Sequence, residues 1–153
     1  MVDLWEVEKR YYYNPLTKGS NSIKAVLPAS LSSSTFLQEK YSQSINKINV
    51  TSKNFPENHI WLGIDNGVIK SPYKMLPPVF KDWSEEELEN TLSDIEDISD
   101  GGAALTAYGK LQYTDMEQEE MEELSSALLK YCELDTLAMV MIFEHFKELV
   151  EHV

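Results

Sequence analysis

One aspartate in the apolar stripe of a predicted carboxy-terminal helix is the residue best placed to do chemistry. The stripe is spaced by three and four residues and consists of Leu124, Leu128, Tyr131, Asp135, Ala138, Ile142, His145 and Leu149. A carboxylate buried on such a face costs several kcal/mol unless another group pairs with it, so we expect Asp135 to have a partner. Tyr131 lies one turn earlier on the same face, which brings a phenol and a carboxylate together.

The residues around this pair belong to a longer motif. Residues 128–138 read LLKYCELDTLA. This run resembles the third motif of proofreading-type exonucleases with a ribonuclease H-like fold, in their tyrosine subclass. The resemblance implies that Asp135 is a catalytic metal ligand, that Tyr131 is catalytic by orienting the attacking water, and that the cofactor is Mg²⁺ or Mn²⁺. The spacing by itself leaves another interpretation open, in which Tyr131 is a core residue and Asp135 binds a backbone amide or a lysine.

Two other segments extend the resemblance along the chain. Residues 19–28 read GSNSIKAVLP, and residues 100–104 read DGGAA with Ala107 and Tyr108 beyond them. Both are similar to segments of a bacterial domain-of-unknown-function family of the same exonuclease class. Three matches in the same order imply a nuclease that acts from the three-prime end of nucleic acid.

The first two motifs of that exonuclease class have no counterpart in the sequence. The first is Asp-x-Glu on a buried strand, and the Asp-x-Glu at residues 94–96 lies in an acidic stretch that favours a loop. We therefore expect residues 1–153 to form a single partial exonuclease-like domain, the carboxy-terminal portion, which needs an upstream catalytic segment as its partner. A lone carboxylate holds a hard cation weakly, so we expect the chain alone to be inactive and to bind no cation tightly.

Charge is divided unevenly along the chain. Residues 1–80 carry nine Lys and Arg against six Asp and Glu, and residues 81–153 carry four against twenty. Because cations dominate phosphate binding, any nucleic-acid contact should use the first half. The contacts that we expect are Lys18, Ser22 and Lys24. Lys9 and Arg10, beside three tyrosines at residues 11–13, are further candidates, although a Tyr-rich start is also typical of packing on a neighbouring element.

The pattern predicts a mainly α fold with a short β-hairpin, as the carboxy-terminal part of a ribonuclease H-like α/β exonuclease domain. Helices are predicted at 3–13, 21–27, 34–42, 85–93, 103–111 and from 114 to about 150, the second ending before Pro28. Leu4, Val7 and Tyr11 should share one face of the first helix, and Phe36, Leu37 and Tyr41 should face inward from the third. The last helix should be buried on several sides between Leu134 and Phe143, and it either runs unbroken or bends near Tyr131.

The hairpin is predicted in the middle of the chain. Residues 60–64 and 68–70 are its strands, and Asn66-Gly67 suits the tight turn between them. It falls within a polar, proline-broken segment, 43–82, which is long enough to indicate a functional loop or an insertion.

Composition excludes several other functions and leaves one alternative. One cysteine excludes an internal disulfide and a Cys-rich zinc site. No apolar run is long enough to cross a membrane and no signal peptide opens the chain, which favours a cytoplasmic protein. The alternative is a non-catalytic helical module that docks a partner domain or chain. Apolar residues left without a packing surface would also favour a homo-oligomer.

Overall fold

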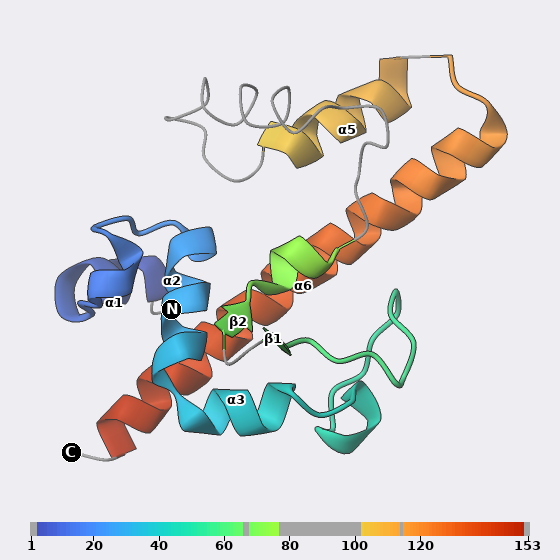
Figure 1. Ribbon diagram of the computed structural model, residues 1–153. Coiled ribbons are helices and arrows are strands. Elements are labelled where there is room, and N and C mark those ends of the chain that lie inside the picture. Colours follow the sequence, from blue (N-terminus) through green and yellow to red (C-terminus); the bar gives the residue numbers. More distant parts are fainter. Residues whose placement is uncertain (1–2, 66–67, 77–101, 114, 152–153) are drawn as a thin grey trace. The chain divides into compact units, whose positions relative to one another are not determined.

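The computed structural model describes residues 3–65, 68–76, 102–113 and 115–151 (Figure 1). Over these residues the chain is mainly helical, with a two-stranded antiparallel hairpin, so the predicted mainly α fold with a short hairpin is confirmed. The chain divides into two compact units, which are described separately. The larger unit comprises Met1–Met75 and Leu134–Val153, and the smaller unit comprises Leu76–Glu133.

The larger unit opens with helix α1, Leu4–Tyr11, and the 3-10 helix η1, Pro15–Thr17. Asp3 caps α1 by accepting a hydrogen bond from the backbone of Trp5, a common way to satisfy a free amide at a helix start. The helix ends two residues earlier than predicted. Tyr11, the last residue of the helix, is 81% exposed.

Helix α2, Ile23–Ser33, crosses the proline that was predicted to end it. Ser22 caps its first turn by accepting from the backbone of Lys24. Pro28 removes one helical hydrogen bond, the one to the carbonyl of Lys24. The next turn buries Ala29, Ser30 and Leu31 completely or almost so, and this packing outweighs the lost bond.

Helix α3, Thr35–Tyr41, follows α2 directly. Ser34 ends α2 and also caps α3, since its hydroxyl accepts from the backbone N–H of Leu37. Leu37 and Tyr41 are fully buried, as predicted, but Phe36 is 44% exposed and does not face inward.

Short elements fill the segment that the sequence marks as a loop or an insertion. They are the 3-10 helices η2, Ile45–Lys47, and η3, Pro72–Met75, and the strands β1, Gly63–Asp65, and β2, Val68–Lys70. The predicted hairpin is confirmed, with Ile64 opposite Ile69, and its Asn66-Gly67 turn lies outside the described residues. The first strand starts three residues later than expected, because Trp61 and Leu62 are buried in the core instead.

Helix α6, Gln118–Glu151, runs unbroken, which decides between the two predicted alternatives. From Leu134 onward it belongs to the larger unit, where α3 and the chain after α1 lie against it (Figure 1). Its inner face buries Leu134, Ala138, Met141 and Ile142. The prediction that this stretch is buried on several sides is wrong, because Met139, Val140 and Phe143 are 44–57% exposed on its other side.

The smaller unit pairs helix α5, Gly102–Tyr113, with the first part of α6. Ala107 and Leu124 form its buried core, and partly buried Leu111, Met116 and Leu128 pack against them. Helix α5 was predicted at 103–111 and is slightly longer at both ends. The helix predicted at 85–93 and the Asp-x-Glu at 94–96 lie outside the described residues.

Candidate functional site

Asp135 is half-buried on α6, and its carboxylate accepts a hydrogen bond from a tyrosine far away in the sequence. The donor is the hydroxyl of Tyr73 in η3, 2.6 Å from Oδ1 of Asp135. An O–H group that donates to an ionised carboxylate forms one of the shorter and stronger protein hydrogen bonds. The expectation that Asp135 has a partner is confirmed, and Tyr73 is a partner that neither sequence-based interpretation named.

Tyr73 also lines a wide groove on the surface of the larger unit. The groove has a volume of about 730 Å³ and is lined by Lys24, Pro28, Val68, Ile69, Lys70, Ser71, Tyr73 and Lys74. We call it the basic groove, because three of these residues are lysines. Lys24 comes from α2, Lys70 from the end of β2 and Lys74 from η3. Helix α2 contacts β2, and η3 follows β2 in the chain.

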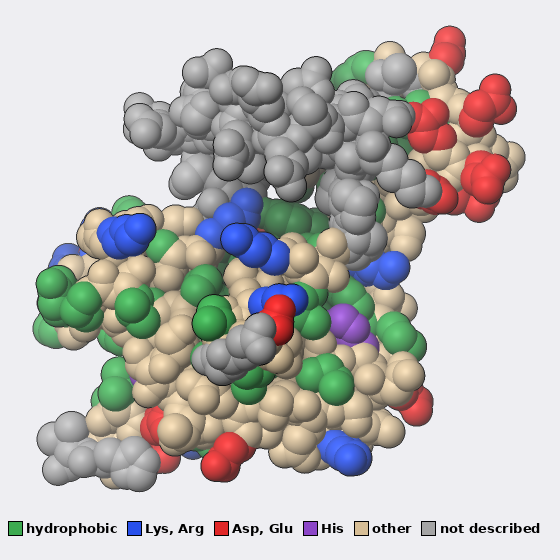
Figure 2. Space-filling view, viewed as in Figure 1, with side chains coloured by type: hydrophobic (Ala, Val, Ile, Leu, Met, Phe, Trp, Pro, Cys, Tyr) green, Lys and Arg blue, Asp and Glu red, His purple; other side chains and the backbone are tan. Residues whose placement is uncertain are grey.

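One lysine of the basic groove lies over an aromatic ring. The ammonium nitrogen of Lys24 lies 5.8 Å from the ring centroid of Tyr73, within the range of a cation–π interaction. Lys70 pairs with Asp65 across the hairpin at 3.0 Å, but both side chains are more than half exposed, so the pair contributes little. In Figure 2, basic side chains gather in the middle of the face that carries the hairpin.

The larger unit, which contains the basic groove, is far less acidic than the whole chain. The net charge of the chain is −13. The larger unit has ten Lys and Arg and ten Asp and Glu, whereas the smaller has three against sixteen. The acidic excess therefore resides in residues 76–133, and the groove lies in an electrically balanced unit where local cations decide the potential.

The residues predicted to contact nucleic acid have different positions. Lys24 lines the basic groove. Ser22 caps α2, so its hydroxyl has a structural role. Lys18 is exposed at the end of η1 with a positive φ of 53°, and it is not among the residues that line the groove.

Tyr131, the other predicted catalytic residue, is nearly buried, with 9% of its surface exposed. It stands one turn before Asp135 on α6 but belongs to the smaller unit, whereas Asp135 belongs to the larger one. The phenol of Tyr73, from the larger unit, donates to the carboxylate of Asp135.

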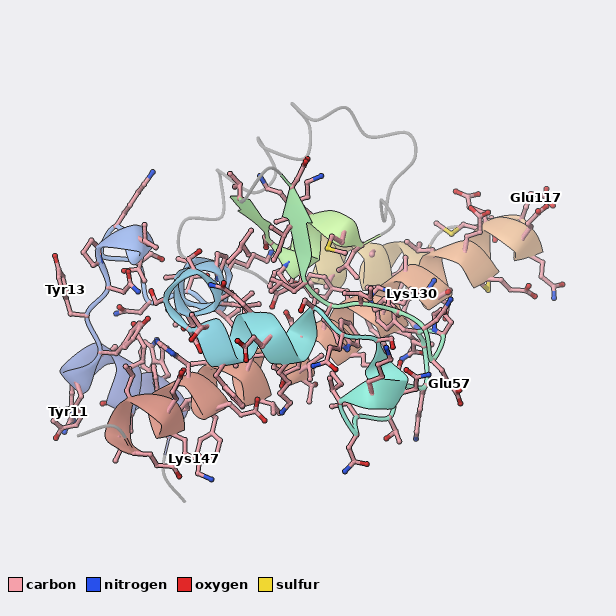
Figure 3. All side chains as sticks on the ribbon, turned by 60° about the horizontal axis from the view of Figure 1, so that its bottom comes forward. Tyr11, Tyr13, Glu57, Glu117, Lys130 and Lys147 are labelled. Carbon is pink, nitrogen blue, oxygen red and sulfur yellow. The ribbon has the colours of Figure 1, made fainter. Side chains whose placement is uncertain are left out.

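The tyrosines near the amino terminus divide into two groups. Tyr11 and Tyr13 point outward at the edge of the larger unit and are 81% and 86% exposed (Figure 3). Tyr12 packs inward: its hydroxyl lies 3.3 Å from Nε2 of His145 and accepts from the side chain of Asn14. The packing alternative therefore holds for Tyr12.

The residues described do not form a cation site of the kind that the exonuclease resemblance implies. Within them, no group of three or more His, Cys, Asp or Glu side chains is arranged to hold a metal ion. Mg²⁺ and Ca²⁺ require several oxygen ligands, and Asp135 offers one carboxylate that is already hydrogen-bonded by Tyr73. We therefore derive no chemical step that uses a cation bound by these residues.

Sequence reasoning missed three residues of the site: Lys70, Tyr73 and Lys74. They occur together in residues 70–74, KSPYK, within the segment predicted as a loop or insertion. Two lysines that flank a tyrosine are the signal that was available, because basic and aromatic side chains interleave in nucleic-acid sites.

Comparison with known proteins gave no match to a family model, to a curated protein or to a solved structure. The site must therefore be interpreted from its own geometry and from the motifs. Among the described helices, none combines the length and the apolar character needed to span a bilayer.

Proposed function

We propose that the chain binds the phosphodiester backbone of single-stranded nucleic acid in the basic groove. The observation that supports this most directly is that Lys24, Lys70 and Lys74 line one groove together with Tyr73. Lysines neutralise phosphates and release counterions, which supplies most of the affinity for a nucleic-acid strand. An aromatic ring among them offers a surface on which a base can stack.

The larger role follows from the motif resemblance. We propose that the groove presents the strand to the carboxy-terminal part of a ribonuclease H-like exonuclease domain that acts from the three-prime end. Asp135 is then one of the carboxylates of the complete domain, with Mg²⁺ or Mn²⁺ supplied to the full set of ligands there. Catalysis belongs to that complete domain, with Tyr131 as the residue that orients water, and strand binding belongs to this chain. The hydrogen bond from Tyr73 to Asp135 supports this division, because it joins the groove to the motif.

The test compares two double variants that remove equal charge. Lys24→Ala with Lys74→Ala removes two cations from the groove, and Lys47→Ala with Lys53→Ala removes two exposed cations elsewhere in the larger unit. Fluorescence anisotropy with a labelled single-stranded oligonucleotide, as DNA and as RNA, gives the affinity across a salt series. We expect the groove variant to reduce the slope of log affinity against log salt by about 1.4, since each phosphate contact contributes about 0.7 on single strands.

The control pair should leave that slope almost unchanged. Equal losses in the two double variants would mean that net charge, and not the groove, governs binding. Absence of binding by the unmodified chain at low salt would also overturn the proposal. Circular dichroism of each variant confirms that the helices are intact.

A second candidate function has its own supporting observation. Met139, Val140 and Phe143 form an exposed apolar surface on the outer side of α6, and such a surface on a helix is typical of docking to another chain. On this proposal the chain is a helical interaction module or a homo-oligomer. Sedimentation of Val140→Ser with Phe143→Ser, against the unmodified chain, would reveal any assembly that depends on this surface.

A further inference from the structure

A small apolar pocket lies on the larger unit and shares no residue with the basic groove. Its volume is about 190 Å³. It is bordered by α1, by residues at the start of α2 and by α6, and one side of it is open to solvent. Its apolar walls are Leu4, Trp5, Ile23, Val26, Met139 and Ile142.

Glu8 is the charged residue that lines this pocket, and its carboxyl group is incompletely satisfied. The residue is only 5% exposed, and Oε2 has no hydrogen-bond partner among the described residues. Burial raises the pKa of Glu8, and the neighbouring Lys9 offsets part of that increase. A buried polar atom without a partner costs about 1–3 kcal/mol, so proteins seldom keep one without a compensating use.

We propose that this pocket binds a small primary amine with an apolar body, and that the ammonium group pairs with Glu8. The size of the body follows from the volume, because an apolar cavity of about 150 Å³ accommodates benzene. A single aromatic ring with a short aminoalkyl chain therefore fits about 190 Å³. A longer peptide segment exceeds this space.

The chemistry of the pocket selects an amine over a neutral or acidic ligand. The apolar walls bury the body of the ligand, and this burial favours binding of an amine, a neutral ligand and an acid equally. The carboxylate repels an acid, whereas an ammonium group donates a charge-assisted hydrogen bond to it. The last torsion of a glutamate side chain is broad, so the carboxylate can adjust to an ammonium group without movement of α1.

The experiment uses 2-phenylethylamine, 2-phenylethanol and phenylacetate as probes, because the three differ mainly in the polar group. Proton–nitrogen NMR spectra of the labelled chain follow the indole resonance of Trp5 during titration. We expect the amine to bind at least about tenfold more tightly than the alcohol, a ratio that corresponds to about 1.4 kcal/mol, and the acid to bind more weakly than either.

Two carboxylate variants assign the preference to one residue. Glu8→Gln keeps the shape and removes the charge, so it should bind amine and alcohol equally. Glu6→Gln on the same helix is the matched control, because Glu6 pairs with Lys9 and Arg10 in solvent and does not line the pocket. It should retain the preference for the amine.

A third variant tests the location of the ligand independently of the charge. Met139→Trp fills the pocket from its rim and should weaken both the amine and the alcohol. Equal binding of the two probes by the unmodified chain, or an amine preference that survives Glu8→Gln, would overturn the proposal. So would an indole resonance of Trp5 that does not respond to the amine.

Discussion

Two regions along α6 hold carboxylates in opposite ways. Asp135 accepts from Tyr73 at the side of an open groove lined by lysines. About two and a half turns later, Glu144 accepts from Lys40 at 2.6 Å and from the hydroxyl of Tyr41 at 3.0 Å. Glu148 accepts from the hydroxyl of buried Ser34. We call these last contacts the α3–α6 cluster.

The difference lies in what surrounds the carboxylates of each region. In the α3–α6 cluster the lysine touches its carboxylate, and burial together with Glu144 raises the pKa of Tyr41, so its phenol stays a donor. Such a closed arrangement stabilises the fold. In the basic groove three lysines line a volume of about 730 Å³, where we propose that a strand binds. On that proposal, carboxylates on one helix serve structure at one end and binding at the other.

The largest expected effect is on the α3–α6 cluster. Glu144→Ala removes the acceptor of the fully buried Tyr41 and the partner of Lys40. We expect the free energy of unfolding to fall by about 2–3 kcal/mol, because hydrogen bonds to charged groups are the stronger ones and their partners are left unsatisfied. Urea denaturation followed by circular dichroism measures this change, and oligonucleotide affinity should be unaffected.

Glu151→Ala is the matched control for that variant. Glu151 pairs with Lys147 on the same helix at 3.5 Å, and both side chains are more than 60% exposed. Its loss should change the free energy of unfolding by no more than about 0.5 kcal/mol. Equal effects of the two substitutions would remove the distinction between a closed cluster and solvated carboxylates.

Local sequence signals predicted the elements of the larger unit well. The starts of three helices, near Asp3, Ser22 and Ser34, and the position of the hairpin follow from residues within a few positions of each other. The prediction that α2 ends before Pro28 was wrong because it also used only local preferences. The local preference of Pro28 is to end a helix, whereas the burial of the following turn, a tertiary effect, keeps α2 helical.

Only part of the candidate site could be predicted from the sequence. Asp135 could be identified because it interrupts an apolar stripe, which is a local pattern in the sequence. Its donor, Tyr73, lies 62 positions away, and the lysines of the groove meet only when β2 and η3 pack beside α2. No spacing rule connects these residues, since their proximity is a consequence of the fold.

A smaller effect concerns acid stability near the same cluster. His145 is 2% exposed, and burial lowers its pKa, although Glu148 at 3.7 Å acts in the opposite direction. The unfolded chain then binds more protons than the folded chain once the pH falls below about 6.5, so stability declines with falling pH. Above that pH the contribution is fully present.

Urea midpoints of the unmodified chain and of His145→Gln, compared between neutral and mildly acidic pH, isolate this contribution. The difference between the two proteins should change with pH by about 1.4 kcal/mol for each unit by which the histidine pKa is lowered. The comparison is needed because Glu8, whose pKa burial raises, contributes the opposite pH dependence in both proteins. A difference that stays constant with pH would show that His145 does not titrate differently in the folded state.

The smallest effect tests whether Lys18 belongs to the basic groove or only to a turn. Its φ of 53° is unfavourable for a residue with a Cβ atom, and it does not line the groove. Lys18→Gly should therefore raise the free energy of unfolding by less than about 1 kcal/mol, because glycine adopts this backbone conformation readily but loses more entropy on folding. Lys18→Ala removes the same charge without relieving the backbone and separates the two causes. Oligonucleotide affinity should be nearly the same in both variants and in the unmodified chain, whereas a loss as large as that of Lys24→Ala would extend the groove to Lys18.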